Sequence, residues 1–214
     1  MKYVFTFVLT AFLMVMTIGC QGSAGSKQPP ATPPGSSQIN PTDNQKQLPL
    51  NDNTLHAGQS AASLGGIRLG MTVEQLDSLL DQVSYTETFE SEGGYFGESL
   101  RIRQYTRQYP HDCQIVLGQT SGKVLQIDVY SASYPTDLGV KVDDRCADAL
   151  KRYRTQYKEW VGHQSDQPLV GWFETEAGVL VIFSCMENQD RINQNLQADS
   201  RITAITLGRV EYFD

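Results

Sequence analysis

Hydrophobic positions divide the chain into a short apolar run, a long polar stretch and a region of mixed patterns. Residues 4–18 are almost entirely apolar, residues 21–63 are polar, and residues 64–214 alternate short apolar and polar segments. The apolar run is about 15 residues long and follows Lys2, whereas a bilayer-spanning helix needs roughly 20 residues. A basic start, a short apolar run and small residues after it are typical of a secretion signal. We therefore expect residues 1–19 to be a signal peptide.

The polar stretch after the signal has the composition of a linker. It is rich in Gly, Ser, Pro, Gln and Asn. It contains no Phe, Trp or Tyr, and the first such residue after it is Tyr85. Such a segment buries too little apolar surface to offset the entropy lost on ordering. The sequence therefore predicts a disordered tether over residues 20–63 and a folded domain over residues 64–214.

Two segments of the folded part resemble each other. GIRLGMT (residues 66–72) and GVKVDDR (residues 139–145) share a glycine, alternating aliphatic and basic residues, and a helix start. Each is followed by a helical pattern, and each half ends on an alternating apolar run, at residues 123–130 and 201–207. Internal similarity at a fixed offset indicates a repeat. We expect duplicated units over residues 64–134 and 135–214.

Each unit opens with a predicted helix. Thr72 and Gln75 form a capping-box pattern ahead of an apolar stripe at helical spacing. In the second unit Asp143 or Asp144 is the expected cap, and the apolar stripe begins at Cys146. The strands expected from alternation cover residues 86–92, 99–109, 113–117, 124–130, 170–174, 179–184 and 201–207. The predicted class is α+β, a tandem repeat of helix-plus-antiparallel-sheet units with the helices packed on one face of a curved sheet.

The charge balance narrows the classes of partner. The chain has 17 Lys and Arg against 24 Asp and Glu, a net charge of −7. Nucleic-acid-binding proteins usually carry basic surfaces, so we expect no nucleic-acid partner. Neither a phosphate loop, a dinucleotide fingerprint nor a spaced metal-ligand motif occurs, so no cofactor and no metal are expected.

The end of the apolar run resembles the lipobox of bacterial lipoproteins. It closes on Gly19 and Cys20, although Thr17 departs from the leucine usual in that family. The resemblance implies a lipidated Cys20 as the mature N-terminus, and hence membrane attachment through acyl chains in the cell envelope. Gln21 follows the cysteine, whereas the family's inner-membrane retention signal has aspartate there.

If Cys20 carries lipid, three cysteines remain, and they permit three alternative single disulfides. Cys146 takes the first core-facing place of the second helix, and Cys185 ends a strand of the same unit. We therefore expect a Cys146–Cys185 disulfide, with Cys113 as the free thiol.

The segment GIRLGMTVEQL (residues 66–76) is similar to the opening of the small outer-membrane lipoprotein family typified by BamE, also called SmpA or OmlA. In that family a Gly-Met-Thr turn starts the first helix behind a lipidated, flexible N-terminus. Two such units in tandem resemble the β-lactamase-inhibitor-protein fold. The resemblance implies that the protein works through contacts with another envelope protein.

The loop GGYFG (residues 93–97) is the most suggestive candidate site. Tyr95 and Phe96 stand between glycines at a predicted hairpin tip, and aromatic residues often anchor interfaces. On the following strand, alternation places basic and tyrosine side chains on one face: Arg101, Arg103, Tyr105 and Arg107. In the alternative interpretation, Phe96 folds back onto the core and these arginines pair with glutamates across the sheet.

An enzymatic role has little support in the sequence. His111 and Cys113 have the residue types of a cysteine nucleophile site, but no third orienting group or hydrolase motif accompanies them. The sequence therefore predicts a non-enzymatic, lipid-anchored envelope protein acting through protein–protein contacts. The alternative is a module that binds a small molecule or cell-wall fragment on the concave sheet face.

Overall fold

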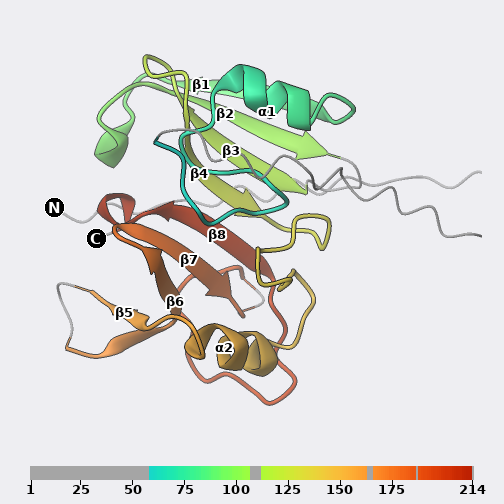
Figure 1. Ribbon diagram of the computed structural model, residues 1–214, viewed down its shortest axis with the longest axis vertical. Coiled ribbons are helices and arrows are strands. Elements are labelled where there is room, and N and C mark those ends of the chain that lie inside the picture. The colour runs from blue at the N-terminus through green and yellow to red at the C-terminus, as the bar shows by residue number, and fades with distance from the viewer. Residues whose placement is uncertain (1–57, 107–111, 163–165, 187, 214) are drawn as a thin grey trace, which may run out of the picture. The chain divides into compact units, whose positions relative to one another are not determined.

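The computed structural model describes residues 58–106, 112–162, 166–186 and 188–213. Within these residues eight strands form one antiparallel sheet in the order β1-β2-β3-β4-β8-β7-β6-β5. The strands are β1 (Ser84–Glu90), β2 (Leu100–Thr106), β3 (Cys113–Gly118), β4 (Val124–Val129), β5 (Glu159–Val161), β6 (Pro168–Glu176), β7 (Val179–Ser184) and β8 (Ala204–Arg209). The helices α1 (Val73–Leu79) and α2 (Cys146–Arg154) lie near opposite ends of this sheet (Figure 1). Two short 3-10 turns complete the fold, η1 (Gly94–Phe96) and η2 (Val210–Tyr212).

The expected α+β class, a tandem repeat of helix-plus-sheet units, is wrong: the fold is mainly β. The helices have only seven and nine residues, and β4 pairs with β8, so strands from both expected units form a single sheet. In the sequence, apolar residues at helical spacing continue beyond the residues at which α1 and α2 end. Leu80 is already the cap of α1, and Trp160 lies in β5, a strand the pattern did not predict. At Trp160, sheet pairing with β6 outweighed local helical periodicity.

Several local predictions are confirmed. Thr72 caps α1, with its side chain accepting from Gln75 and the Gln75 side chain accepting from the Thr72 backbone. The hairpins β1–β2, β3–β4 and β6–β7 pair antiparallel as expected. The cap of α2 differs from expectation, because Arg145 takes that position and Asp143 adopts a positive φ of 73° just before it.

The main core lies between the two helices and one face of the sheet. Leu76 of α1 and Tyr153 of α2 belong to the same buried cluster as Ile115, Ile127 and Phe183 from the sheet. Trp172, Leu180 and Ile182 form a smaller cluster, with Val210 and Phe213 of the C-terminal segment packed against it. Since β-strand side chains alternate between faces, the sheet is buried on both sides over β6, β7 and β8.

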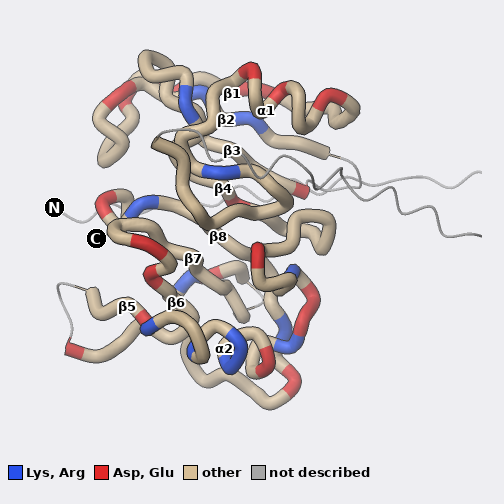
Figure 2. Tube along the Cα trace, viewed as in Figure 1, with Lys and Arg blue, Asp and Glu red and all other residues tan. Residues whose placement is uncertain are grey.

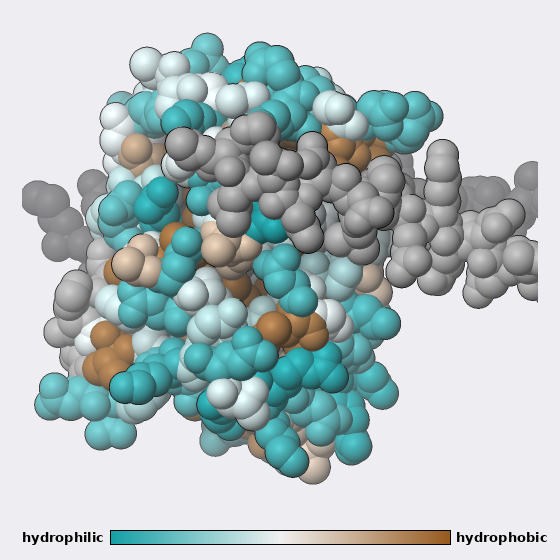
Figure 3. Space-filling view, in the orientation of Figure 1, coloured by the Kyte–Doolittle hydropathy of each residue, from teal (hydrophilic) through white to brown (hydrophobic). Residues whose placement is uncertain are grey.

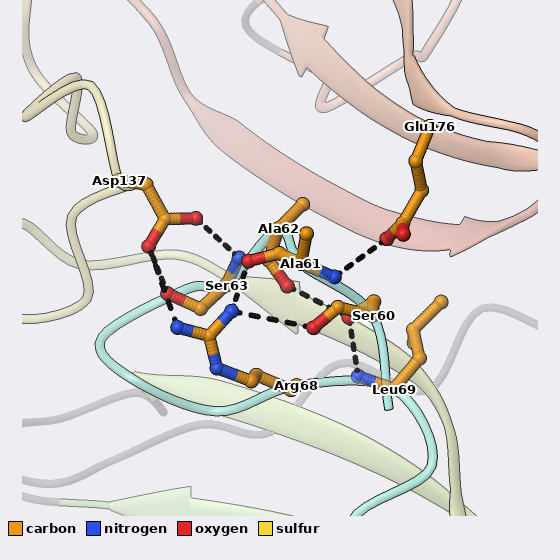
Figure 4. Close-up of polar contacts among 8 residues, drawn as sticks. All are labelled: Ser60, Ala61, Ala62, Ser63, Arg68, Leu69, Asp137 and Glu176. Atoms are coloured by element: carbon orange, nitrogen blue, oxygen red, sulfur yellow. Dashed lines mark hydrogen bonds and ion pairs between the residues drawn. The ribbon is translucent and has the colours of Figure 1, made fainter. Parts of the chain in front are cut away.

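The chain makes ordered contacts before residue 64, where the folded domain was expected to begin. Ser63 donates from its backbone and hydroxyl to Asp137, each at 2.6 Å, and Ala61 donates its N–H to Glu176 at 2.7 Å. Arg68 donates to the Ala61 carbonyl as well. Figure 4 shows Asp137 and Glu176 reaching this segment from two sides. The rest of the expected tether, with Cys20, lies outside the described residues.

Candidate functional site

The aromatic loop predicted at the hairpin tip connects β1 to β2 and contains η1. Gly93 is required there, because a Cβ at this position would lie 1.7 Å from the Glu98 carbonyl oxygen. Gly97 ends the turn with a φ of 73°, in the left-handed region that favours glycine. These glycines fix the tight turn that carries Tyr95 and Phe96.

Tyr95 and Phe96 have different surroundings at this tip. Tyr95 is 80% exposed, whereas Phe96 is partly buried and packs on Tyr212 of η2, with ring centroids 4.3 Å apart. Phe96 therefore folds back against the C-terminal turn, and Tyr95 is the residue a partner can reach.

The expected exposed Arg–Tyr strip on β2 is wrong for its two central members. Arg103 is 4% exposed and Tyr105 is 1% exposed, because α1 covers this face of the strand. Arg103 donates through Nε to Glu87 of β1 at 2.6 Å, and its guanidinium also pairs with Asp77 of α1. The alternative expectation of cross-strand pairing with a glutamate thus holds for Arg103, whose register partner is Glu87.

Charge at Arg103 is maintained despite burial. Burial by itself disfavours the charged form, but hydrogen bonds with Glu87, Tyr105 and Asp77 outweigh it and raise the pKa of Arg103. Burial also raises the pKa of Tyr105, to about 12, against the opposing effect of Arg103. Both groups keep their usual protonation state at neutral pH.

The remaining predicted strip residues do not join this cluster. Arg101 is partly exposed, and its Nε is buried without a hydrogen-bond partner among the described residues. Arg107 lies outside the described residues, as does His111. A rim of four side chains around the aromatic tip is therefore not formed.

The sequence pattern did not identify the exposed face of β1. All seven residues of this edge strand are exposed, and they include Tyr85 at 44% and Phe89 at 60%. The guanidinium of Arg103 lies 4.4 Å from the centre of the Tyr85 ring, and Tyr105 packs on the same ring at 5.1 Å. Arg103 and Tyr105 of β2 thus pack beside Tyr85 on the same face of the sheet. Alternation of aromatic residues with threonine and glutamate in SYTETFE (residues 84–90) was the available signal.

Hydrophobic surface is otherwise dispersed. In the view of Figure 3 it forms small patches separated by hydrophilic residues. Basic and acidic positions are interspersed along the folded chain in Figure 2. Five large hydrophobic side chains are exposed in the described part of the chain, and three of them lie on β1 and η1. We call these three residues, Tyr85, Phe89 and Tyr95, the aromatic surface of β1 and η1.

The three cysteines within the described residues behave as predicted. Cys146 and Cys185 form a disulfide with a Cα–Cα distance of 6.1 Å, and Cys113 is a free, buried thiol. Burial, and after it the nearby Asp128 and Asp112, raises the pKa of Cys113 well above its usual value. A thiol needs to ionise to act as a nucleophile, so this environment disfavours catalysis at Cys113.

Comparisons with known proteins add little. No family model matches the chain, and no curated protein does. The crystal structure of the uncharacterized protein yfeY from Escherichia coli is similar with a TM-score of 0.40 and 14% identity, over 65% of this chain and 90% of that chain. This likeness is too weak to support a fold or a function. The resemblance to BamE-type lipoproteins stays a prediction.

Proposed function

We propose that this protein is a lipid-anchored, non-enzymatic binding protein of the bacterial cell envelope that acts through contacts with another protein. The apolar leader ending at Cys20 supports the lipid anchor and the location outside the cytoplasm. The acidic net charge of −7 supports attachment by acyl chains rather than by attraction to anionic lipid. None of the described helices has the length and hydrophobicity needed to cross a bilayer.

The observation that carries the proposed protein contact is the aromatic surface of β1 and η1. Strand β1 stands at one end of the sheet, and within that sheet it pairs only with β2. Its outer edge offers backbone donors and acceptors to a further strand, and extended peptides often bind exposed sheet edges in this way. Phe89 is an exposed residue of this strand, and Tyr95 is exposed in the loop that follows it; aromatic residues of this kind often anchor interfaces.

These features favour one kind of occupant, an extended segment of an envelope protein. Such a segment would add a strand next to β1 and place apolar side chains against Tyr85 and Phe89. The pairing of Glu87 with Arg103 holds the strand in position before the partner arrives. A rigid, preformed edge reduces the ordering cost of association.

Lipid attachment predicts a modified N-terminus. Mass spectrometry of the protein purified from membranes should show a mature chain that begins at Cys20 and carries diacylglycerol. A Cys20→Ala variant should lose the modification and leave the membrane fraction. An unmodified mature chain that begins at another residue would contradict the anchor.

The protein contact predicts site-specific crosslinking in intact cells. A photoreactive phenylalanine analogue at position 89 should give a discrete crosslinked product, because Phe89 lies on β1, whose outer edge has no strand partner among the described residues. The same analogue at Val161, 43% exposed on the strand at the other end of the sheet, serves as the control and should give no such product.

Once the crosslinked partner is identified and purified, the affinity of this protein for that partner tests the aromatic anchors. The Phe89→Ala, Tyr95→Ala double variant should bind at least tenfold more weakly, because truncating two interface anchors costs more than 1.4 kcal/mol. An unchanged affinity in a folded double variant, or equal crosslinking from Val161, would refute the proposed surface.

A further inference from the structure

The edge strand β1 belongs to the most acidic part of the chain. Between Arg68 and Arg107, residues 69–106 contain seven Asp or Glu and only two Arg, a net charge of −5, out of −7 for the whole chain. These residues form α1, β1, η1 and β2 at one end of the sheet. Figure 2 shows acidic positions on α1 and on the connection between β1 and β2. Most of the net negative charge therefore lies in the elements around the β1 edge.

One buried arginine serves two carboxylates beside this edge. Arg103 donates to Glu87 of β1 at 2.6 Å and also pairs with Asp77 of α1. The three side chains together carry a net charge of −1. The side chains of Glu87 and Asp77 are 34% and 48% exposed, whereas that of Arg103 is 5% exposed. The uncompensated negative charge is therefore open to a partner, and the positive charge is not.

The second arginine, Arg101, acts on a different carboxylate. Hydrogen bonds with its own backbone and with Thr72 lower the pKa of Glu74, and the charge of Arg101 lowers it further. Three more acidic side chains at this end of the sheet are exposed and form no ion pair with another described residue: Asp81, Glu90 and Glu92. Arg101 therefore does not neutralise the surface around β1.

Glu87 stands between two aromatic side chains on one face of β1. The pairing register sets Tyr85, Glu87 and Phe89 opposite alternate residues of β2, so these three side chains share a face of the sheet. Glu90 falls on the other face. A strand added beside β1 would place three alternate side chains next to the aromatic, acidic and aromatic side chains of this face.

A second copy of this chain fits the edge poorly. Antiparallel pairing of two β1 strands about their centre would set the two Glu87 side chains directly opposite each other, and like charges in such positions are destabilising. Strand β1 has the sequence SYTETFE and contains no Lys or Arg, so no other register brings opposite charges together. The charge of the edge therefore disfavours self-association and favours a partner of opposite charge.

We propose that the segment that docks on β1 is basic: a Lys or Arg of the partner faces Glu87, and apolar residues two positions before and after it face Tyr85 and Phe89. This inference rests on the protein contact proposed above and specifies the chemistry of its occupant. The basic side chain compensates the charge that one guanidinium leaves on Glu87 and Asp77. The apolar side chains cover the exposed rings, and the partner's backbone pairs with the strand edge.

Synthetic peptides test the charge requirement without an identified partner. The probe is the labelled peptide Thr-Leu-Thr-Lys-Thr-Leu-Thr, and two matched peptides carry glutamine or glutamate in place of lysine. Fluorescence anisotropy with the full mature chain in neutral detergent measures the affinities at low ionic strength. The lysine peptide should bind about threefold more tightly than the glutamine peptide and about tenfold more tightly than the glutamate peptide. Added salt should reduce these differences, because it screens exposed charges.

Variants assign the preference to Glu87. Glu87→Gln should bind the lysine and glutamine peptides equally. Glu90→Gln is the matched control: it removes the same charge from the same strand, but on the other face, and should keep the preference for lysine. If Glu87→Gln does not fold, Asp77→Asn replaces it. Arg103 would then neutralise Glu87 alone, and the preference for lysine should again be lost.

Two results would overturn the basic partner and leave the contact at β1 standing. They are equal affinities of the wild type for all three peptides, and an unchanged preference for lysine in the folded Glu87→Gln variant. A wild-type dimer that the Phe89→Ala, Tyr95→Ala double variant abolishes would also overturn it, since a second copy would then occupy the edge. Failure of every peptide to bind would overturn it as well, and crosslinking at position 89 would decide separately whether the proposed protein contact exists.

Discussion

Replacing Cys146 and Cys185 together by alanine is expected to lower the free energy of unfolding by about 4 kcal/mol. The disulfide joins residues 39 apart in sequence, and in the chain-entropy model a loop of that size restricts the unfolded chain by this amount. Cys146 opens α2 and Cys185 follows β7, so the bond fastens the helix to the sheet. Denaturant unfolding under non-reducing conditions, compared with the wild type, measures the difference.

Reduction of the wild type provides the control for this disulfide. Dithiothreitol should lower the stability of the wild type toward that of the double variant, and should leave the double variant unchanged. The buried thiol Cys113 is present in both proteins, so it contributes equally to each measurement. A loss smaller than about 1 kcal/mol would contradict the prediction.

Phe183→Ala is expected to destabilise the protein by about 3–5 kcal/mol, the range for truncating a fully buried phenylalanine. Phe183 is 0% exposed on β7, and its ring packs edge-on against Tyr153 of α2, with centroids 4.6 Å apart. Phe173 of β6 lies 6.0 Å away in a second edge-on contact. The substitution would therefore leave a cavity where α2 meets the sheet. Thermal or denaturant unfolding measures the loss.

The matched control is the same substitution at an exposed site. Phe89→Ala removes a phenylalanine that is 60% exposed on the edge strand β1. Its expected effect on stability is within about 0.5 kcal/mol, as for most surface substitutions. If Phe89→Ala proved as destabilising as Phe183→Ala, Phe89 would be a core residue, and the docking surface proposed for β1 would lose its support.

Local signals in the sequence predicted local structure well. The Thr72–Gln75 capping box depends on residues three apart, and it formed as expected. The strands of the three hairpins are joined by short connections, so their alternation and glycine-rich turns specify both partners. The Cys146–Cys185 disulfide followed from placing both residues at a helix–sheet junction.

Prediction failed where distant segments decide which face of a strand is buried. The alternation on β2 predicted an exposed face of arginine and tyrosine side chains, yet α1 covers this face and buries Arg103 and Tyr105. The long stem of arginine can be buried while its charge is paired with Glu87 and Asp77. A residue-by-residue pattern does not contain the position of α1, so it cannot reveal this pairing.

The sequence by itself determined the leader pattern ending at Cys20, the acidic balance, the strands of each hairpin and the cap of the first helix, because neighbouring residues specify these features. Only the tertiary structure decided that β4 pairs with β8 in one mainly β sheet, since that pairing joins segments about 80 residues apart. It also decided that β1 is an exposed edge and that Asp77 and Glu87 share the buried Arg103. Burial depends on which segments meet in space, and those contacts are long-range.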